Sequence, residues 1–126
     1  METNQESKLG AETKDPQFVL LVNLKFASVE DRQTFEKKLV PLVEYVGKNE
    51  QYALSYCMLR DEKDETKLTI FERYETQAKM SGHSSSPLFQ KLIRPGAEAY
   101  KALSAPPVKS YQKLFFHGGI NGYFSK

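Results

Sequence analysis

Apolar residues follow two different periods along the chain, and the period changes several times. Four stretches, residues 18–26, 51–60, 67–74 and 108–116, are typical of β-strands. The first of them, FVLLVNLKF, is almost continuously apolar, as in a strand that is covered on both faces. The charged link DEKDET between the second and third stretches predicts a β-hairpin.

A helix is predicted between the first and second strands. Ser28 begins it, because Ser-Val-Glu-Asp supplies a capping hydroxyl and places acids in the first turn. Apolar residues then recur at helical spacing, and Gly47 predicts the end of the helix. Pro41 lies within this stretch, so we expect a kink or a break there.

A second helical region, interrupted twice, is predicted between the third and fourth strands. A short helix capped by Thr76 ends at Gly82, and Ser86 with a proline after it begins the next. The Pro-Gly pair at 95–96 interrupts this helix before a last helical segment over residues 97–103.

The resulting order of elements, β-α-β-β-α-β, predicts an α+β fold of the ferredoxin-like type. In this fold both helical regions pack on one face of a four-stranded antiparallel sheet. The even positions of the first strand are apolar, but so are Val19 and Leu21 on its other face. Since helices cover only one face, we expect a second copy of the sheet to cover the other, in a homodimer with facing sheets.

The 126 residues suit a polar arm over residues 1–16, one folded domain over 17–116 and a tail over 117–126. A net charge of +2 and scattered lysines give no reason to expect nucleic-acid binding. No apolar run approaches the roughly 18 residues that span a membrane, and the start lacks a signal-peptide core, so we expect a cytoplasmic protein. The single cysteine, Cys57, is expected to be an inert core thiol. Two histidines cannot make a histidine-rich metal site unaided.

Residues 61–89 carry a recognisable order of features: a charged hairpin, a strand that ends in Glu72-x-Tyr74, a short helix, His83, and then Ser-Pro-Leu-Phe89. This order resembles the antibiotic-biosynthesis monooxygenase family, in which a Glu-x-Trp pair takes the place of Glu72 and Tyr74. The resemblance in element order extends over residues 17–116.

The resemblance implies a dimeric α+β barrel in which each protomer holds an apolar pocket between sheet and helices. Family members oxidise electron-rich aromatic or polyketide substrates of secondary metabolism with molecular oxygen, and they use no flavin, haem or metal as cofactor. Deprotonation of such a substrate gives a carbanion or phenolate that itself passes an electron to oxygen, so the protein only binds the ring, assists deprotonation and stabilises the oxyanion. Tyr74 replaces the family tryptophan, which leaves the substrate class open.

Two residues are candidates for catalysis. His83 suits a general base or a donor to the substrate oxygen, because its ordinary pKa lies near 6.5; alternatively it ties the helix junction together through backbone carbonyls. Asn23 is the only uncharged polar residue within the first strand. It either bonds to a neighbour or holds an oxyanion in a cavity, and the resemblance favours the second role because some family members place a functional Asn there.

Five residues are candidates for substrate binding: Tyr74, Phe71, Phe89, Glu72 and Tyr56. The aromatic side chains would hold a ring, although most aromatics of such a domain belong to its core or dimer interface. Glu72 is either a buried acid with a raised pKa or, as is more usual, the partner of a nearby Lys or Arg.

Other function classes stay as alternatives. A dimeric protein on the same fold could bind a hydrophobic metabolite without changing it. Haem binding or degradation is a weaker alternative, because no residue of the second helical region stands out as an axial histidine. The serines at 84–86 beside His83 suggest a hydrolase, but the chain has no strand-turn-helix G-x-S-x-G motif.

Overall fold

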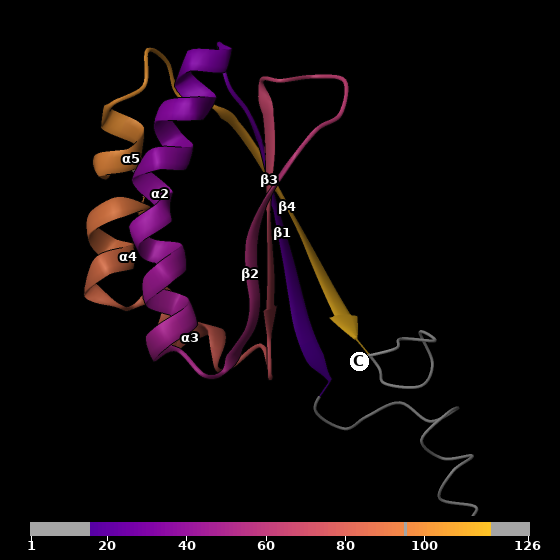
Figure 1. Cartoon of the computed structure of the whole chain (residues 1–126). Helices are drawn as coiled ribbons and strands as arrows, with labels where there is room; N and C mark the ends of the chain where they lie inside the picture. Colours follow the sequence, from indigo (N-terminus) through magenta and orange to yellow (C-terminus); the bar gives the residue numbers. More distant parts are fainter. Residues whose placement is uncertain (1–15, 95, 117–126) are drawn as a thin grey trace, which may run out of the picture.

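The computed structural model describes residues 16–94 and 96–116, in which helices cover one face of an antiparallel sheet (Figure 1). The sheet contains four strands in the order β2-β3-β1-β4. In chain order the elements are β1 (Gln17–Lys25), α2 (Val29–Asn49), β2 (Ala53–Arg60), β3 (Lys67–Tyr74), α3 (Met80–Ser84), α4 (Pro87–Leu92), α5 (Glu98–Lys101) and β4 (Val108–Phe116). The predicted ferredoxin-like α+β fold and the β2–β3 hairpin are thereby confirmed.

Helix α2 begins where the sequence predicts and ends later than expected. The Ser28 hydroxyl accepts a hydrogen bond from the backbone N–H of Asp31 at 3.1 Å, which confirms the N-cap. The predicted stop at Gly47 and a break at Pro41 are both wrong, because α2 runs without interruption to Asn49. Pro41 is exposed and removes only one backbone hydrogen bond, whereas side chains on both sides of it are buried against the sheet: Phe35, Leu39, Leu42 and Val46.

Helix α3 departs from the prediction at both ends. The Thr76 hydroxyl accepts from the backbone N–H of Lys79, but the helix begins only at Met80. Gly82 lies inside α3 and does not end it. A Cβ atom at this position would lie 2.8 Å from the hydroxyl oxygen of Tyr52, so a side chain at position 82 would collide with the tyrosine. The glycine therefore allows a close approach and is not a stop signal.

Helix α4 begins as predicted, since the Ser86 hydroxyl accepts from the backbone N–H of Phe89 at 3.2 Å. Gly96, with a φ of +80°, lies between α4 and α5 in the left-handed region that favours glycine. The last helical segment is shorter than expected, and α5 covers only Glu98–Lys101. Residue 95 and most of the predicted arm and tail (residues 1–15 and 117–126) lie outside the described residues.

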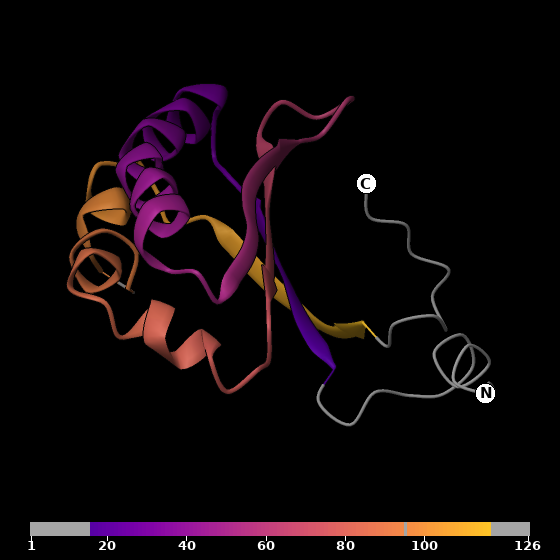
Figure 2. The same ribbon diagram turned by 60° about the horizontal axis from the view of Figure 1, so that its bottom comes forward.

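The two faces of the sheet differ in what covers them. Seen from a second direction, the helices that Figure 1 labels lie on one side of the sheet (Figure 2). The even residues of β1 point to the helices and are buried, whereas Val19 and Leu21 point to the face without helices and are only half-buried. Cys57 pairs with Phe71 in the register of β2 and β3. It lies on this open face and is exposed, so the prediction of a core thiol is wrong.

Within the described ranges, no helix has the length and apolar character that crossing a membrane requires.

Candidate active site

A cavity of about 140 Å³ lies between the sheet and the helices, on the face where the core is packed. Apolar side chains of β1, β3 and α4 form part of its wall, including Leu20, Ile70 and Phe89. Polar and further aromatic residues that line it come from five strands and helices: Tyr56, Glu72, His83, Ser84, Tyr100, Lys109 and Tyr111. The cavity therefore combines an apolar wall with a few ionisable groups, as ligand sites do.

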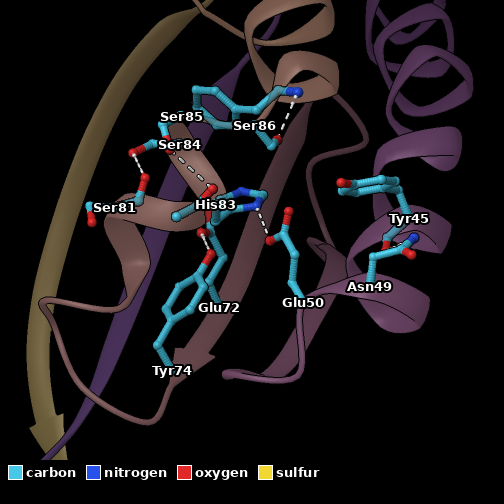
Figure 3. A network of polar contacts seen from close by, with 12 residues as sticks. Tyr45, Asn49, Glu50, Glu72, Tyr74, Ser81, His83, Ser84, Ser85 and Ser86 are labelled. Carbon is cyan, nitrogen blue, oxygen red and sulfur yellow. Dashed lines mark hydrogen bonds and ion pairs between the residues drawn. The ribbon is translucent and has the colours of Figure 1, made fainter.

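His83 is the centre of the polar network in this region (Figure 3). It sits on α3, only 2% exposed, with its Nδ1 atom 2.8 Å from Oε1 of Glu50. Three aromatic rings surround the imidazole, with centroids at 4.9 Å (Tyr56), 5.0 Å (Phe89) and 5.9 Å (Tyr74). The imidazole is thus held by one carboxylate and packed among rings on its other sides.

The surroundings of His83 fix its protonation state. Burial lowers the pKa of His83, and the nearby Glu50 carboxylate only partly opposes this, so the ring is neutral near pH 7. Its Nε2 atom is buried and has no hydrogen-bond partner in the described part of the chain. With its proton on Nδ1, the imidazole donates a hydrogen bond to Glu50, and Nε2 carries only a lone pair. The opposite tautomer would bury an N–H group on Nε2 without an acceptor. Nε2 is therefore the basic nitrogen.

Glu72 and Tyr74 form a second buried pair beside His83. The Tyr74 hydroxyl donates a hydrogen bond to Oε1 of Glu72 at 2.6 Å, and the glutamate is only 5% exposed. Burial raises the pKa of Glu72 to about 7; the bond from Tyr74 opposes this and the charge of Glu50 adds to it. No Lys or Arg of the described residues lies within 4.0 Å of its carboxylate. The expected ion pair is replaced by a buried acid, because Glu72 points to the core.

The structure brings together most of the residues that the sequence singled out. Glu72, His83, Tyr56 and Phe89 line one cavity, and the Tyr74 side chain contacts both Glu72 and the His83 ring. Tyr74 is fully buried, and burial raises its pKa above the ordinary value, which suits a packing and hydrogen-bonding role.

Asn23 and Phe71 lie elsewhere. Both occupy odd positions of their strands and face the open side of the sheet, where they line a separate, wider depression of about 760 Å³. The Asn23 Oδ1 atom accepts a hydrogen bond from the Thr69 hydroxyl at 2.9 Å. The expectation that Asn23 and Phe71 share a pocket with His83 is therefore corrected by the alternation of side chains along a strand.

Glu50 was missed by the sequence reasoning. It follows α2 directly and is only 4% exposed. In the sequence it stands between Asn49 and Gln51, among polar residues typical of a solvated link. No local pattern distinguishes it from the other acids, because its partner His83 lies 33 residues further along the chain. In the described ranges, no group of three or more His, Cys, Asp or Glu side chains is arranged to hold a metal ion.

Comparison with known proteins gives a consistent result. The sequence model of the family described as antibiotic biosynthesis monooxygenase matches residues 18–95. No curated protein sequence matches the chain significantly.

Several solved structures share the fold. A candidate antibiotic biosynthesis monooxygenase of Caulobacter crescentus is 22% identical with a TM-score of 0.65, covering 78% of this chain and 89% of its own. One from Nitrosomonas europaea is 12% identical with a TM-score of 0.63, covering 84% and 93%. A Bacteroides thetaiotaomicron protein of unknown function, described as a possible oxidoreductase, is 13% identical with a TM-score of 0.63, covering 81% and 99%.

Proposed function

The chain belongs to the antibiotic biosynthesis monooxygenase family, and from this premise we propose that it oxidises a small electron-rich aromatic substrate with molecular oxygen and without a cofactor. One observation carries the proposal: a buried, neutral His83, oriented by Glu50, lies at an apolar cavity together with the protonatable Glu72. Deprotonation is the step that a phenolic substrate needs before it can react with oxygen.

In the proposed reaction, Nε2 of His83 accepts the proton of a phenolic hydroxyl, and the Glu50 carboxylate stabilises the imidazolium that forms. The phenolate passes one electron to oxygen, and the radical pair combines at a ring carbon that carries a hydrogen. The peroxide anion formed in this way takes back the proton from the His83 imidazolium. The hydroperoxide then loses its ring C–H hydrogen and its terminal OH group as water, which leaves a carbonyl. Atoms and electrons balance, since one phenolic O–H, one C–H and one O₂ give two C=O groups and one H₂O.

Glu72 has a proposed role in the last step of this reaction, the loss of water. With a pKa of about 7, its carboxyl is partly protonated at neutral pH and can give a proton to the departing hydroxide, which leaves as water. The resulting carboxylate can then accept the ring C–H proton. Tyr74 holds one carboxyl oxygen of Glu72 at 2.6 Å and so fixes the orientation of the acid. Tyr56 and Phe89 provide ring surfaces that flank His83 and would stack on the substrate.

The size of the cavity favours a substrate with one ring. A protein cavity of about 150 Å³ lined by apolar side chains is known to hold benzene. The cavity beside His83 has about 140 Å³, whereas pockets for larger ligands usually exceed about 300 Å³. Hydroquinones and related phenols therefore fit the proposal better than multi-ring polyketides do.

We further propose that the protein is a homodimer with facing sheets, as the sequence predicts. The open face carries large apolar side chains that no helix covers: Leu59, Val108 and Leu114, between 47% and 73% exposed, and the half-buried Leu21 and Phe71. Burial of such a surface stabilises association at roughly 25 cal/mol per Å² of apolar area. A second copy would offer the same apolar face.

Oxygen uptake by chelator-treated protein tests the enzymatic proposal, with a panel of hydroquinones, naphthols and anthrones as substrates. The proposal predicts uptake above the spontaneous rate with single-ring substrates, and a loss of most of this uptake in the His83→Gln variant. Unchanged uptake in this variant would contradict the role of His83.

The runner-up function is a binding protein for a hydrophobic metabolite. The closely packed aromatic rings around His83 favour it as well, because they suit ligand binding without any reaction. Saturable binding of a panel compound, with no oxygen consumption by that compound, would favour this function over the monooxygenase.

A further inference from the structure

Within the described residues, the cavity of His83 is lined by a single lysine and by no arginine. Lys109, on β4, donates a hydrogen bond from its Nζ atom to the Tyr100 hydroxyl at 3.0 Å. The ammonium also lies 4.8 Å from the ring centroid of Tyr100 and 5.7 Å from that of Tyr111. Within the described ranges, no carboxylate is within 4.0 Å of it. This half-buried cation therefore has aromatic neighbours but no counter-ion in the described chain.

The lysine stays charged at neutral pH. Burial alone lowers the pKa of Lys109, but its contacts with the hydroxyls of Tyr100 and Tyr111 more than offset this, so the pKa is raised. An ammonium has three hydrogen-bond donors, and the contacts of Lys109 with the hydroxyls of Tyr100 and Tyr111 use two of them. The third is available to a ligand.

The cation and the acid–base group lie toward different ends of the cavity. In the sheet, β1 separates β4, which carries Lys109, from β3, which carries Glu72. Two strand spacings correspond to roughly 10 Å. Within the register, Lys109 pairs with Leu24, and Leu24 pairs with Leu68, four residues from Glu72 along β3. The cavity thus has Glu72 and His83 near one end and the ammonium of Lys109 toward the other.

We propose that the cavity takes a single-ring hydroxylated aromatic carboxylate, whose carboxylate pairs with Lys109 while its hydroxyl faces His83. The Glu50 carboxylate beside the histidine would repel a carboxylate there, as would Glu72 when it is ionised, and the lysine would attract it at the opposite end. Charge alone therefore orients the ring with its hydroxyl toward the base. This inference rests on the proposed function for the reaction of the ligand. Binding of the aromatic carboxylate through Lys109 can be tested independently of any reaction.

Binding of an unreactive pair of ligands provides the test. 4-Hydroxybenzoate and 4-hydroxybenzamide have nearly the same shape and differ in charge, and calorimetry gives both dissociation constants without any need for oxygen. The wild-type protein is expected to bind the benzoate at least about tenfold more tightly, since a hydrogen bond to a charged group is worth roughly that factor. Equal affinities for the two ligands would overturn the inference.

Two substitutions at position 109 and one control separate ligand binding from a structural role. Lys109→Met should abolish the preference for the benzoate, and Lys109→Arg should keep it. Lys113→Met removes the next lysine on the same face of β4, which pairs with Leu20 and does not line the cavity, and should leave the preference intact. If Lys109→Met keeps the preference, or if Lys113→Met loses it equally, the inference is wrong. Should the methionine variant unfold, Lys109→Gln, which also removes the charge, takes its place and should likewise abolish the preference.

The result also distinguishes this inference from the proposed function. If the benzoate binds through Lys109 but 2,5-dihydroxybenzoate consumes no oxygen, the site for an aromatic acid stands and the monooxygenase proposal fails. If neutral hydroquinones react and the benzoate is not preferred, the monooxygenase stands and the role of Lys109 fails.

Discussion

Glu72→Gln is expected to change how the stability of the protein depends on pH. Burial raises the pKa of Glu72 from its ordinary value of 4.5 to about 7. Between these two values the folded chain holds more protons at this carboxyl than the unfolded chain does. Folding stability therefore falls as the pH rises through this window. Below pH 4.5 the carboxyl is protonated in both states, and its ionisation then costs the folded state nothing.

The size of the effect follows from the same two values. A difference of about 2.5 pH units corresponds to about 3 kcal/mol at about 1.4 kcal/mol per unit. Glutamine does not ionise, so the free energy of unfolding of Glu72→Gln lacks this decrease with pH. Between pH 4.5 and pH 8 it should therefore rise by about 3 kcal/mol relative to that of the wild type. Any constant effect of the new amide on the bond from Tyr74 cancels in this comparison.

Urea unfolding at fixed protein concentration, measured from pH 4.5 to 8 for both proteins, gives the difference directly. Glu44→Gln on the exposed side of α2 serves as the control and should follow the wild type. Parallel pH profiles of the wild type and Glu72→Gln would refute the claim that Glu72 is a buried acid.

Three further predictions concern the site and its support. Glu50→Gln should lower kcat at least about tenfold and shift the acid limb of the kcat/KM profile to lower pH, because the pKa of His83 falls without the carboxylate. Glu44→Gln, on the exposed side of α2, is the control and should do neither. An unmoved limb in Glu50→Gln would contradict the role of Glu50. Gly82→Ala should cost about 1–3 kcal/mol in urea unfolding by displacing Tyr52, and a neutral result would contradict the close approach. Leu114→Asp on the open face should convert the proposed dimer to a monomer, as measured by light scattering. Val40→Asp on α2 is the control and should leave the dimer intact. A monomeric wild type would contradict the proposed dimer.

The fold could be predicted from the sequence because its signals are local. Strand β1 lies where the apolar residues predict it, and its side chains alternate between the two faces of the sheet. The Ser28 and Ser86 N-caps also lie at the predicted positions. The predicted break at Pro41 is wrong because the packing of side chains on both sides of it outweighs the loss of one backbone hydrogen bond. Gly82 misled it because its reason is a contact with Tyr52, which is distant in sequence.

The site could be predicted only in part, because its geometry depends on contacts between distant segments. His83, Glu72 and Tyr74 follow one another within a short motif, and the structure brings them together. Asn23 was assigned to the same pocket because the sequence gives the alternation along β1 but not which face carries the cavity. Glu50 reaches His83 only through the way α2 packs, which no local pattern encodes.

The origin of the oxygen in the product tests the central claim most directly. Chelator-treated protein is given a hydroquinone under ¹⁸O₂, and the product is analysed by mass spectrometry together with the water and hydrogen peroxide formed. A monooxygenase with His83 as its base should give a product with one labelled oxygen atom, formed without peroxide and almost absent with His83→Gln. An unlabelled product that forms with an equal amount of hydrogen peroxide, or one that His83→Gln forms as fast as the wild type, would contradict it.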